Sequence, residues 1–341
     1  MRVNYYLRPL LLILVFLNTF SGTQPNGLKG FKIEGFAQGT TFHITYYAND
    51  STVKKKTIEN LFGNIDSSLS IYKPYSLINK FNNSVLGVEM DEHLCKVVQR
   101  SLDIYKETDG IFDISIYPVV DAWGFGIRKV TSFPNSEDIK SMLYCVGSNK
   151  IYIKGNWLLK DVPCLKIDVN GIAQGYSVDV IADFLESSGI RNYLVEIGGE
   201  IRVKGRKQPD GKIMKIGIEQ PSDIDIDEPA LQKIIKLGDG AITTSGNYRK
   251  YIQIGSKRIS HQMDPKSGYP IDNELISVTV RAKNAIIADG YDNALMGMGL
   301  EKALLFLTKH KELEAYFIFH KPDGSVADTA TTGFYEPEIK Y

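Results

Sequence analysis

The sequence lacks an excess of charge of either sign. Its 40 Lys and Arg residues balance its 40 Asp and Glu residues, so the formal net charge is zero when the histidines are neutral. A protein without a net field does not draw nucleic acid or anionic lipid to its surface over a distance. We therefore expect no nucleic-acid partner and favour a small molecule or another protein.

Cysteine is also scarce. Cys95, Cys145 and Cys164 form no C-x-x-C pair, and their odd number leaves at least one thiol free in an oxidising compartment. We interpret the three cysteines as small apolar residues buried in the core. A single disulfide is the alternative.

Several common catalytic motifs are missing. The sequence contains no G-x-S-x-G, no P-loop pattern, no H-E-x-x-H and no Cys–His zinc spacing. These patterns mark serine hydrolases, phosphate-binding loops and zinc sites, respectively. The chemistry of the chain therefore has to be sought in other residues.

The apolar run at residues 9–17, PLLLILVFL, is too short for a comfortable membrane span. Arg2 and Arg8 lie on its N-terminal side, and a small polar stretch at residues 18–23 follows it, which is the layout of a secretory signal peptide. We predict cleavage after Ser21 or Thr23. An uncleaved membrane anchor over residues 1–23 is the alternative. No cysteine follows the apolar run, so the sequence does not indicate a lipid anchor.

The remainder of the chain has the composition of a globular protein. Among 341 residues, 43% are hydrophobic and 23% are charged, which suffices for one large domain or two modest ones. No repeat or long linker divides the sequence. We predict a single α+β domain over residues 28–341, with a mixed, largely antiparallel sheet and flanking helices.

Periodicity predicts the main elements of this domain. Apolar alternation indicates a hairpin at 31–47, turning at Gly39 and Thr40, and strands at 165–169, 192–197, 200–204 and 274–282. Helical spacing indicates helices at 53–69, at 87–109, from 170 to Gly189, and at 286–299. We expect an irregular connection at 123–145 and a solvated acidic loop at 222–229.

The predicted last helix contains polar residues in an apolar stretch, IIADGYDNALMGMG. Asp289, Asp292 and Asn293 are spaced to share one helix face, where they would present three oxygen donors to one point. Oxygen ligands suit a hard cation such as Mg²⁺, so the spacing indicates a divalent-cation site. The alternative is that one of these side chains caps or hydrogen-bonds a neighbouring loop.

Two further segments contain residues that could bind or react. KIDVNGIAQGYSVD, residues 166–179, places Asp168 at a strand end and Gly171 and Gly175 at a helix start, where free N–H groups favour anions. Many ordinary strand-to-helix turns have this composition. His261 lies in the loop HQMDPKSGYP and could act as a general base, although a lone histidine is also often structural.

Six segments, taken together and in order, resemble the ApbE family of FAD:protein FMN transferases. They are TDGIFDISIYPVVDAWGFG at 108–126, DVNGIAQGY at 168–176, EIGGEIRVKG at 196–205, TSG at 244–246, HQMDPKSGYP at 261–270 and ADGYDNA at 288–294. The resemblance extends over about residues 31–335. Six ordered motifs over this span are difficult to obtain by chance.

The resemblance implies an exported, periplasmic enzyme that binds FAD as substrate and uses Mg²⁺ at its pyrophosphate. It implies transfer of FMN to a Thr or Ser hydroxyl of an acceptor protein through a phosphoester, with release of AMP. The implied acceptors are electron-transport subunits of the NADH:quinone reductase and Rnf types, and association with the inner membrane follows if the N-terminal segment stays attached. Alternatives are a Mg²⁺-dependent FAD pyrophosphatase and a flavin-binding protein without turnover.

The resemblance also implies roles for individual residues. The metal would be held by the Gly171 carbonyl, Asp289 and Asn293, with Asp292 beside them, and His261 would be the base, in a loop oriented by Asp264. FAD would contact the following residues: Tyr72, Ile111, Phe112, Asp113, Asp168, Gln174 and Gln262. The chain departs from the family pattern at three positions, with Asn293 for Thr, Gln174 for Lys or Glu, and Gln38 for Met.

Overall fold

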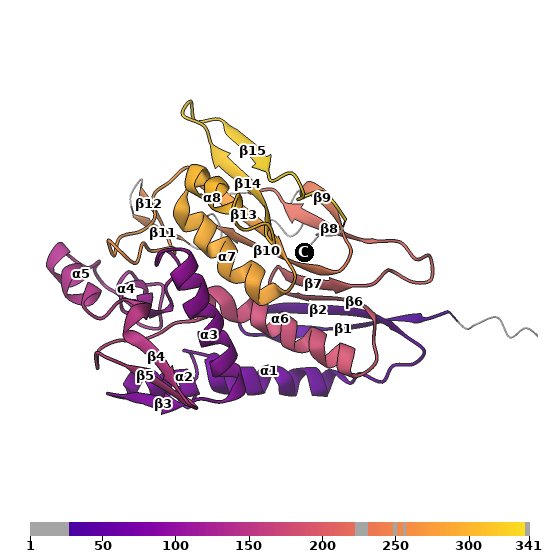
Figure 1. Ribbon diagram of the computed structural model, residues 1–341, viewed down its shortest axis with the longest axis horizontal. Helices are drawn as coiled ribbons and strands as arrows, with labels where there is room; N and C mark the ends of the chain where they lie inside the picture. The colour runs from indigo at the N-terminus through magenta and orange to yellow at the C-terminus, as the bar shows by residue number, and fades with distance from the viewer. Residues whose placement is uncertain (1–26, 222–230, 248–250, 255–256, 338–341) are drawn as a thin grey trace, which may run out of the picture.

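The computed structural model describes residues 27–221, 231–247, 251–254 and 257–337 (Figure 1). The predicted export segment and the acidic loop at 222–229 lie outside the described residues. No helix within the described part of the chain is long and apolar enough to span a membrane.

An antiparallel sheet of eight strands forms the centre of the domain, in the order β1-β2-β6-β7-β10-β13-β14-β15. Every pairing between neighbours in this order is antiparallel. The strands are β1 (Lys29–Ala37), β2 (Thr40–Ala48), β6 (Asn192–Ile197), β7 (Glu200–Lys204), β10 (Gly240–Gly246), β13 (Leu275–Ala282), β14 (Glu314–His320) and β15 (Val326–Ala330). The sheet and the helices around it confirm the predicted α+β class.

Two long helices cover one face of the large sheet (Figure 1). They are α6 (Asn170–Ser187) and α7 (Ala285–Met298), which pack against each other and against the middle strands. The opposite face is covered by a hairpin of β8 (Met214–Glu219) and β9 (Leu231–Leu237). Because both faces are covered, β13 is buried along its whole length.

The remaining elements surround this centre. A small sheet has the order β3-β5-β4, with β3 (Gly87–Glu89), β4 (Ile151–Lys154) and β5 (Trp157–Lys160). A separate hairpin consists of β11 (Tyr251–Ile254) and β12 (Lys257–Ser260). The other helices are α1 (Lys55–Leu69), α2 (Leu77–Asn83), α3 (Glu92–Glu107), η1 (Ile114–Ile116), α4 (Tyr117–Ala122), α5 (Ser136–Leu143), η2 (Ser148–Lys150) and α8 (Leu300–Leu307).

Most predicted elements with a strong period are confirmed. The first hairpin turns at Gln38 and Gly39, whose φ angles of 53° and 79° are left-handed, as tight hairpin turns require. The predictions for β6 and β7 match the observed bounds, and α6 ends before Gly189, which also has a positive φ. These elements were predictable because their apolar periods are local.

Two predictions about helical segments were wrong, and one helix was missed. The predicted helix at 87–109 begins with β3, and only Glu92–Glu107 is helical, because Asp91 caps the helix by accepting from the Leu94 N–H at 2.8 Å. The predicted irregular connection at 123–145 contains α5, which begins with a capping box at Asn135. The short helix α2 was not predicted.

The strand predicted at 165–169 was wrong, because this segment belongs to no sheet of the described residues. Leu165, Ile167 and Val169 are buried in alternation, as predicted. Their segment makes separate bonds instead of a ladder to a neighbouring strand: the Asn82 amide bonds both backbone groups of Ile167, and the Asp168 N–H donates to the Ile114 carbonyl at 2.8 Å. Alternation revealed the buried face but could not reveal the absence of a partner strand.

The interpretation of the cysteines as residues buried in the core was wrong, since none of the three is buried, and the alternative, a single disulfide, is confirmed. A disulfide joins Cys145 to Cys164, whose Cα atoms are 5.5 Å apart, and Cys164 is exposed. Cys95 is a half-buried free thiol. The disulfide links the segment after α5 to the segment that leads into α6.

Candidate functional site

A pocket of about 310 Å³ opens between the N-terminal end of α6, the middle of α7, strand β10 and two loops. The loops contain residues 111–116 and 261–271. All the residues predicted for the site line this pocket: Tyr72, Ile111, Phe112, Asp113, Asp168, Gly171, Gln174, His261, Gln262, Asp289, Asp292 and Asn293. The fold thus brings together residues that are far apart in the sequence, while their chemical roles stay predictions.

Helix α7 is held in place at its first turn. The Asp179 carboxylate, on α6, accepts from the N–H groups of Ala285 at 3.0 Å and Ile286 at 2.9 Å. It also pairs with Arg202 at 2.9 Å. A carboxylate at a helix N-terminus satisfies free N–H groups and interacts favourably with the helix dipole. These bonds fix the position of α7 along its axis relative to α6. They therefore also fix the position of Asp289, which lies one turn further along α7.

The two helices come closest at Gly175. A Cβ atom at this position would lie 2.7 Å from the Cβ of Asp289 and closer still to the Ala285 carbonyl oxygen. The Gly175 N–H donates to Asp289 Oδ2 at 2.8 Å. In a regular helix this N–H would donate to the carbonyl of residue 171, four positions earlier. The Asp289 bond therefore competes for the donor that normally occupies the Gly171 carbonyl.

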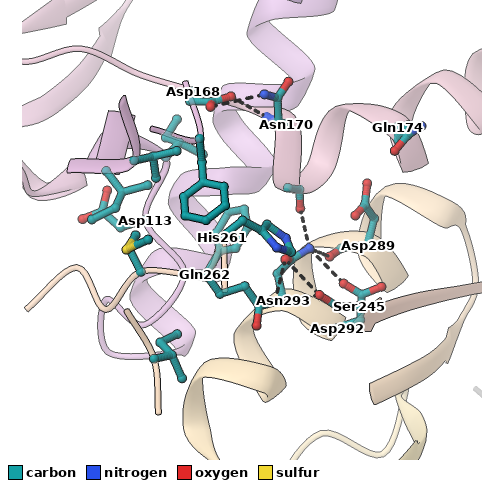
Figure 2. A pocket seen from close by; sticks show the side chains of 18 of the residues that line it. Asp113, Asp168, Asn170, Gln174, Ser245, His261, Gln262, Asp289, Asp292 and Asn293 are labelled. Atoms are coloured by element: carbon teal, nitrogen blue, oxygen red, sulfur yellow. Dashed lines mark hydrogen bonds between the residues drawn. The ribbon is translucent and has the colours of Figure 1, made fainter. Parts of the chain in front are cut away.

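Asn293 occupies the centre of a network of oxygen atoms (Figure 2). Its Nδ2 atom donates to the Gly171 carbonyl at 3.2 Å, the Asp289 carbonyl at 3.0 Å and Asp292 Oδ1 at 3.0 Å. Its Oδ1 atom accepts from the Ser245 hydroxyl at 3.2 Å. The Asn293 N–H₂ group thus donates to oxygen atoms that could also bind a cation.

The two carboxyl groups on α7 are buried, with Asp289 4% and Asp292 1% exposed. Burial, together with the charge of Asp179, raises the pKa of Asp289 to about 7, although the Gly175 N–H opposes the shift. Burial and the neighbouring Asp289 charge also raise the pKa of Asp292 well above its ordinary value. Ionising both groups in this pocket is unfavourable unless a positive charge compensates them.

Within the described residues, no three His, Cys, Asp or Glu side chains form a cluster that could hold a metal ion. A cation site here would instead combine the two carboxylates with a backbone carbonyl and an amide oxygen. Such all-oxygen sets suit Mg²⁺, which often has only one or two carboxylate ligands. Asp289 also hydrogen-bonds the neighbouring helix α6 through the Gly175 N–H, whereas the alternative predicted from the sequence was a bond to a loop.

The wall opposite α7 contains Asp113, which organises its own loop. The carboxylate accepts from the N–H and hydroxyl of Ser115 at 2.8 and 2.6 Å, and from those of Ser148 at 3.1 and 2.5 Å. Burial raises the pKa of Asp113, and these donors oppose that shift. Because both oxygens already accept hydrogen bonds, the observed contribution of Asp113 is to hold residues 111–116 against the pocket.

Three polar side chains meet near the start of α6, those of Tyr72, Asp168 and Asn170 (Figure 2 shows Asp168 beside Asn170). Asp168 Oδ1 accepts from the Asn170 N–H at 2.8 Å, and the Asn170 amide is 3.4 Å from the Tyr72 hydroxyl. Burial, followed by the negative charge of Asp168, raises the pKa of Tyr72. This group gives the mouth of the pocket one aromatic ring and one carboxylate.

The loop containing His261 is anchored on both sides. Trp123 Nε1 donates to the Gly268 carbonyl at 2.9 Å, and the Asp264 carbonyl accepts from the Gly268 N–H at 2.8 Å. His261 is half-buried, and its ring meets that of Phe125 edge-on at 6.3 Å. The following residue, Gln262, donates to the Ser245 hydroxyl at 2.8 Å. The loop thereby connects to the Asn293 network.

Several residues that line the pocket had no role from the sequence, and two of them, Glu200 and Ser245, interact with Asp292 and Asn293. Glu200, at the start of β7, is 9% exposed, and its charge contributes to the raised pKa of Asp292. Ser245 bonds both Asn293 and Gln262. Both lie in motifs that the sequence singled out, EIGGEIRVKG and TSG, but neither motif shows which side chains face the pocket.

Gln38 is absent from the pocket lining. It occupies the left-handed turn between β1 and β2, and its Nε2 atom donates to Asp66 Oδ1 at 3.3 Å. It does not line the pocket in this structure, whereas Gln174 does. Of these two departures from the family pattern, only the Gln174 position changes the pocket lining.

Comparisons with known proteins match this chain over most of its length. A model of the ApbE family matches residues 38–317. The FAD:protein FMN transferase of Vibrio cholerae is 36% identical over 299 residues, which cover 86% of this chain and 88% of that protein.

Solved structures agree. The flavin transferase ApbE from Vibrio cholerae superposes with a TM-score of 0.81 at 35% identity, covering 90% of this chain and 98% of that one. The apo form of the flavinyl transferase ApbE from Pseudomonas stutzeri gives 0.81 at 34% identity, covering 91% and 97%. The chain therefore belongs to the ApbE family and is an enzyme, a transferase.

Proposed function

We propose that this chain transfers FMN from FAD to a Ser or Thr hydroxyl of an acceptor protein. The observation that carries the proposal is the buried pair Asp289 and Asp292, which lines one pocket with the motif residues of the family. The names of the relatives, FAD:protein FMN transferase, support the same reaction. The product would be a phosphoester-linked flavin, with AMP released.

The residues present fit a divalent cation. Two buried carboxyl groups with raised pKa values lie beside the Gly171 carbonyl oxygen and the Asn293 side chain, which together form a hard, all-oxygen donor set. These four groups would hold Mg²⁺, with the Asn293 amide turned to present its oxygen. When bound, the cation would neutralise pyrophosphate oxygens and stabilise the charge that develops as phosphorus is attacked.

His261 is the proposed base of the transfer step. The acceptor hydroxyl oxygen forms a bond to the FMN phosphorus, the P–O bond to AMP breaks, and the imidazole accepts the hydroxyl proton. The anchored loop at 261–270 would hold the ring at the pocket, with the Asp264 backbone closing the loop through Gly268. No covalent enzyme intermediate is needed.

The flavin and nucleotide would contact the opposite wall and the mouth of the pocket. The contacts are proposed for Tyr72, Ile111, Phe112, Asp113, Asp168, Gln174 and Gln262, all of which line it. Gln174 offers a neutral amide where the family pattern has a charge. We therefore propose that this position contributes a hydrogen bond instead of an ionic contact.

The setting of the reaction is also a proposal. Residues 1–23 have the layout of an export signal or anchor, which supports a periplasmic enzyme that is either released or held at the inner membrane. The corresponding acceptors would be electron-transport subunits of the NADH:quinone reductase or Rnf type that carry a Ser/Thr flavinylation motif.

One experiment separates the possible activities. The purified protein is incubated with FAD, Mg²⁺ and an acceptor that carries a Ser/Thr flavinylation motif, and the acceptor is then run on a denaturing gel. Flavin fluorescence that stays with the acceptor supports the transferase. Free FMN and AMP without labelling would indicate a pyrophosphatase, and unchanged FAD would indicate a binding protein.

A further inference from the structure

Helix α2 hydrogen-bonds two segments that contribute residues to the pocket, although no residue of α2 lines it. Ile78 and Phe81 are completely buried on this helix, and the Ser76 hydroxyl caps it by accepting from the Asn79 N–H at 3.3 Å. Asn79 and Asn82 are three residues apart, so their side chains lie on neighbouring positions of one helix face. Each of these amides bonds the backbone beside a residue that lines the pocket.

Asn79 holds the turn that carries Tyr72. Its Nδ2 atom donates to the Ile71 carbonyl at 2.8 Å and to the Lys73 carbonyl at 2.9 Å. One amide group therefore bonds the residues immediately before and after Tyr72. The Tyr72 side chain is 59% exposed, so packing alone does not fix its backbone.

Asn82 holds the segment that carries Asp168. Its Nδ2 atom donates to the Ile167 carbonyl at 2.9 Å, and its Oδ1 atom accepts from the Ile167 N–H at 2.8 Å. At Ile167 these two bonds take the place of bonds to a neighbouring strand, since the segment belongs to no sheet of the described residues, and the Asp168 N–H next to it donates to the Ile114 carbonyl at 2.8 Å. Asn82 is 5% exposed, so water does not readily take over its bonds.

We propose that α2 is a positioning element, in which Asn79 and Asn82 set the positions of Tyr72 and Asp168 relative to each other at the mouth of the pocket. Asn170 connects Tyr72 and Asp168, because it hydrogen-bonds Asp168 and contacts the Tyr72 hydroxyl. The inference rests on the proposed function in one respect: the ligand whose binding depends on this geometry is the flavin nucleotide. Neither asparagine contacts that ligand, so both act through the residues that they hold.

The chemistry of the amide makes the inference testable. Asn82 needs a donor for the Ile167 carbonyl and an acceptor for the Ile167 N–H, and an aspartate of the same shape keeps only the acceptor. Asn82→Asp therefore places a carboxylate oxygen against a carbonyl oxygen. Asn83, the next residue on α2, is exposed, so Asn83→Asp adds the same charge one position away and serves as the matched control.

The experiment measures FAD binding to the purified full-length protein by quenching of flavin fluorescence, with thermal unfolding of each variant without FAD. We expect Asn82→Asp to weaken FAD binding by about threefold to tenfold, the typical worth of a lost buried hydrogen bond. Asn83→Asp should change the dissociation constant by less than about twofold. Asn79→Asp provides a second variant that keeps the inference testable if Asn82→Asp does not fold.

Double-mutant cycles distinguish positioning from a general loss of stability. The effect of Asn82→Asp on FAD binding should disappear in an Asp168→Ala background, and that of Asn79→Asp should disappear in a Tyr72→Ala background. The inference would be overturned, without affecting the proposed function, if these effects persisted in the Ala backgrounds. It would also be overturned if Asn82→Asp bound FAD as tightly as the wild type. A wild-type protein that binds no FAD would overturn the proposed function together with it.

Discussion

Gly175→Ala tests how closely the site depends on the crossing of α6 and α7. The new Cβ would lie 2.7 Å from the Asp289 Cβ and closer to the Ala285 carbonyl oxygen. Both neighbours belong to the first turns of α7, which Asp179 holds to α6 through two backbone N–H groups. Neither neighbour is the flexible end of a side chain, so the clash can be relieved only by moving one helix.

The magnitude follows from these distances. Carbon atoms in contact prefer about 3.5–4.0 Å, so the helices would have to separate locally by about 1 Å. Overpacking of this kind typically lowers the free energy of unfolding by about 1–3 kcal/mol. The same displacement would lengthen the Gly175–Asp289 bond, and a shift of about 1 Å at a reacting centre can lower a rate by about 100-fold.

Urea unfolding and Mg²⁺-dependent AMP release measure the two effects. Gly63→Ala is the matched control, because Gly63 is an exposed residue of α1 and a Cβ there meets nothing within 4 Å. Replacing an unstrained helical glycine by alanine should stabilise the protein by about 0.4–1 kcal/mol and leave the activity unchanged. If Gly175→Ala keeps wild-type stability and activity, the close crossing does not position Asp289 and the reasoning fails.

Three further predictions concern single side chains. Asp289→Ala should abolish Mg²⁺-dependent turnover while circular dichroism shows an intact fold, and full activity of this variant at low Mg²⁺ would remove Asp289 from the cation site. His261→Gln should preserve FAD binding in a fluorescence titration but slow transfer by about two to four orders of magnitude, as for a lost general base; wild-type rates would rule out that role. Burial lowers the pKa of Lys160 to about 8, so between about pH 8 and pH 10.5 the unfolded state binds more protons than the folded state. The free energy of unfolding of the wild type should therefore rise with pH in this window relative to Lys160→Met, and parallel urea-derived pH curves for the two proteins would contradict the assignment.

The sequence predicted the parts of the fold that depend on local periods. The first hairpin, β6, β7, α6 and α7 each carry a clear alternation or helical spacing and end at a glycine or another turn residue. By contrast, α2 and α5 are too short to show a period over several turns. The segment at 165–169 alternates like a strand, but its partners are the Asn82 side chain and the Ile114 carbonyl, both from distant parts of the chain.

The candidate site was predictable for a different reason. The resemblance to a family identified its residues, all of which except Tyr72 lie in the six ordered motifs, and the fold brings all of them to one pocket. The motifs did not reveal Glu200 and Ser245 as neighbours of Asp292 and Asn293, because that proximity depends on the crossing of β7 and β10 with α7. The Cys145–Cys164 disulfide was equally hidden, since sequence spacing does not give the distance between two loops.

The most direct test of the central claim is the intact mass of an acceptor protein after incubation with this enzyme, FAD and Mg²⁺. We expect the acceptor to gain the mass of one phosphoester-linked FMN, with one AMP released per acceptor labelled, and we expect a chelator or Asp289→Ala to prevent both. An acceptor whose target Ser or Thr is replaced by Ala should stay unmodified. AMP release without any gain in acceptor mass, or labelling that persists after replacement of that hydroxyl, would contradict the account.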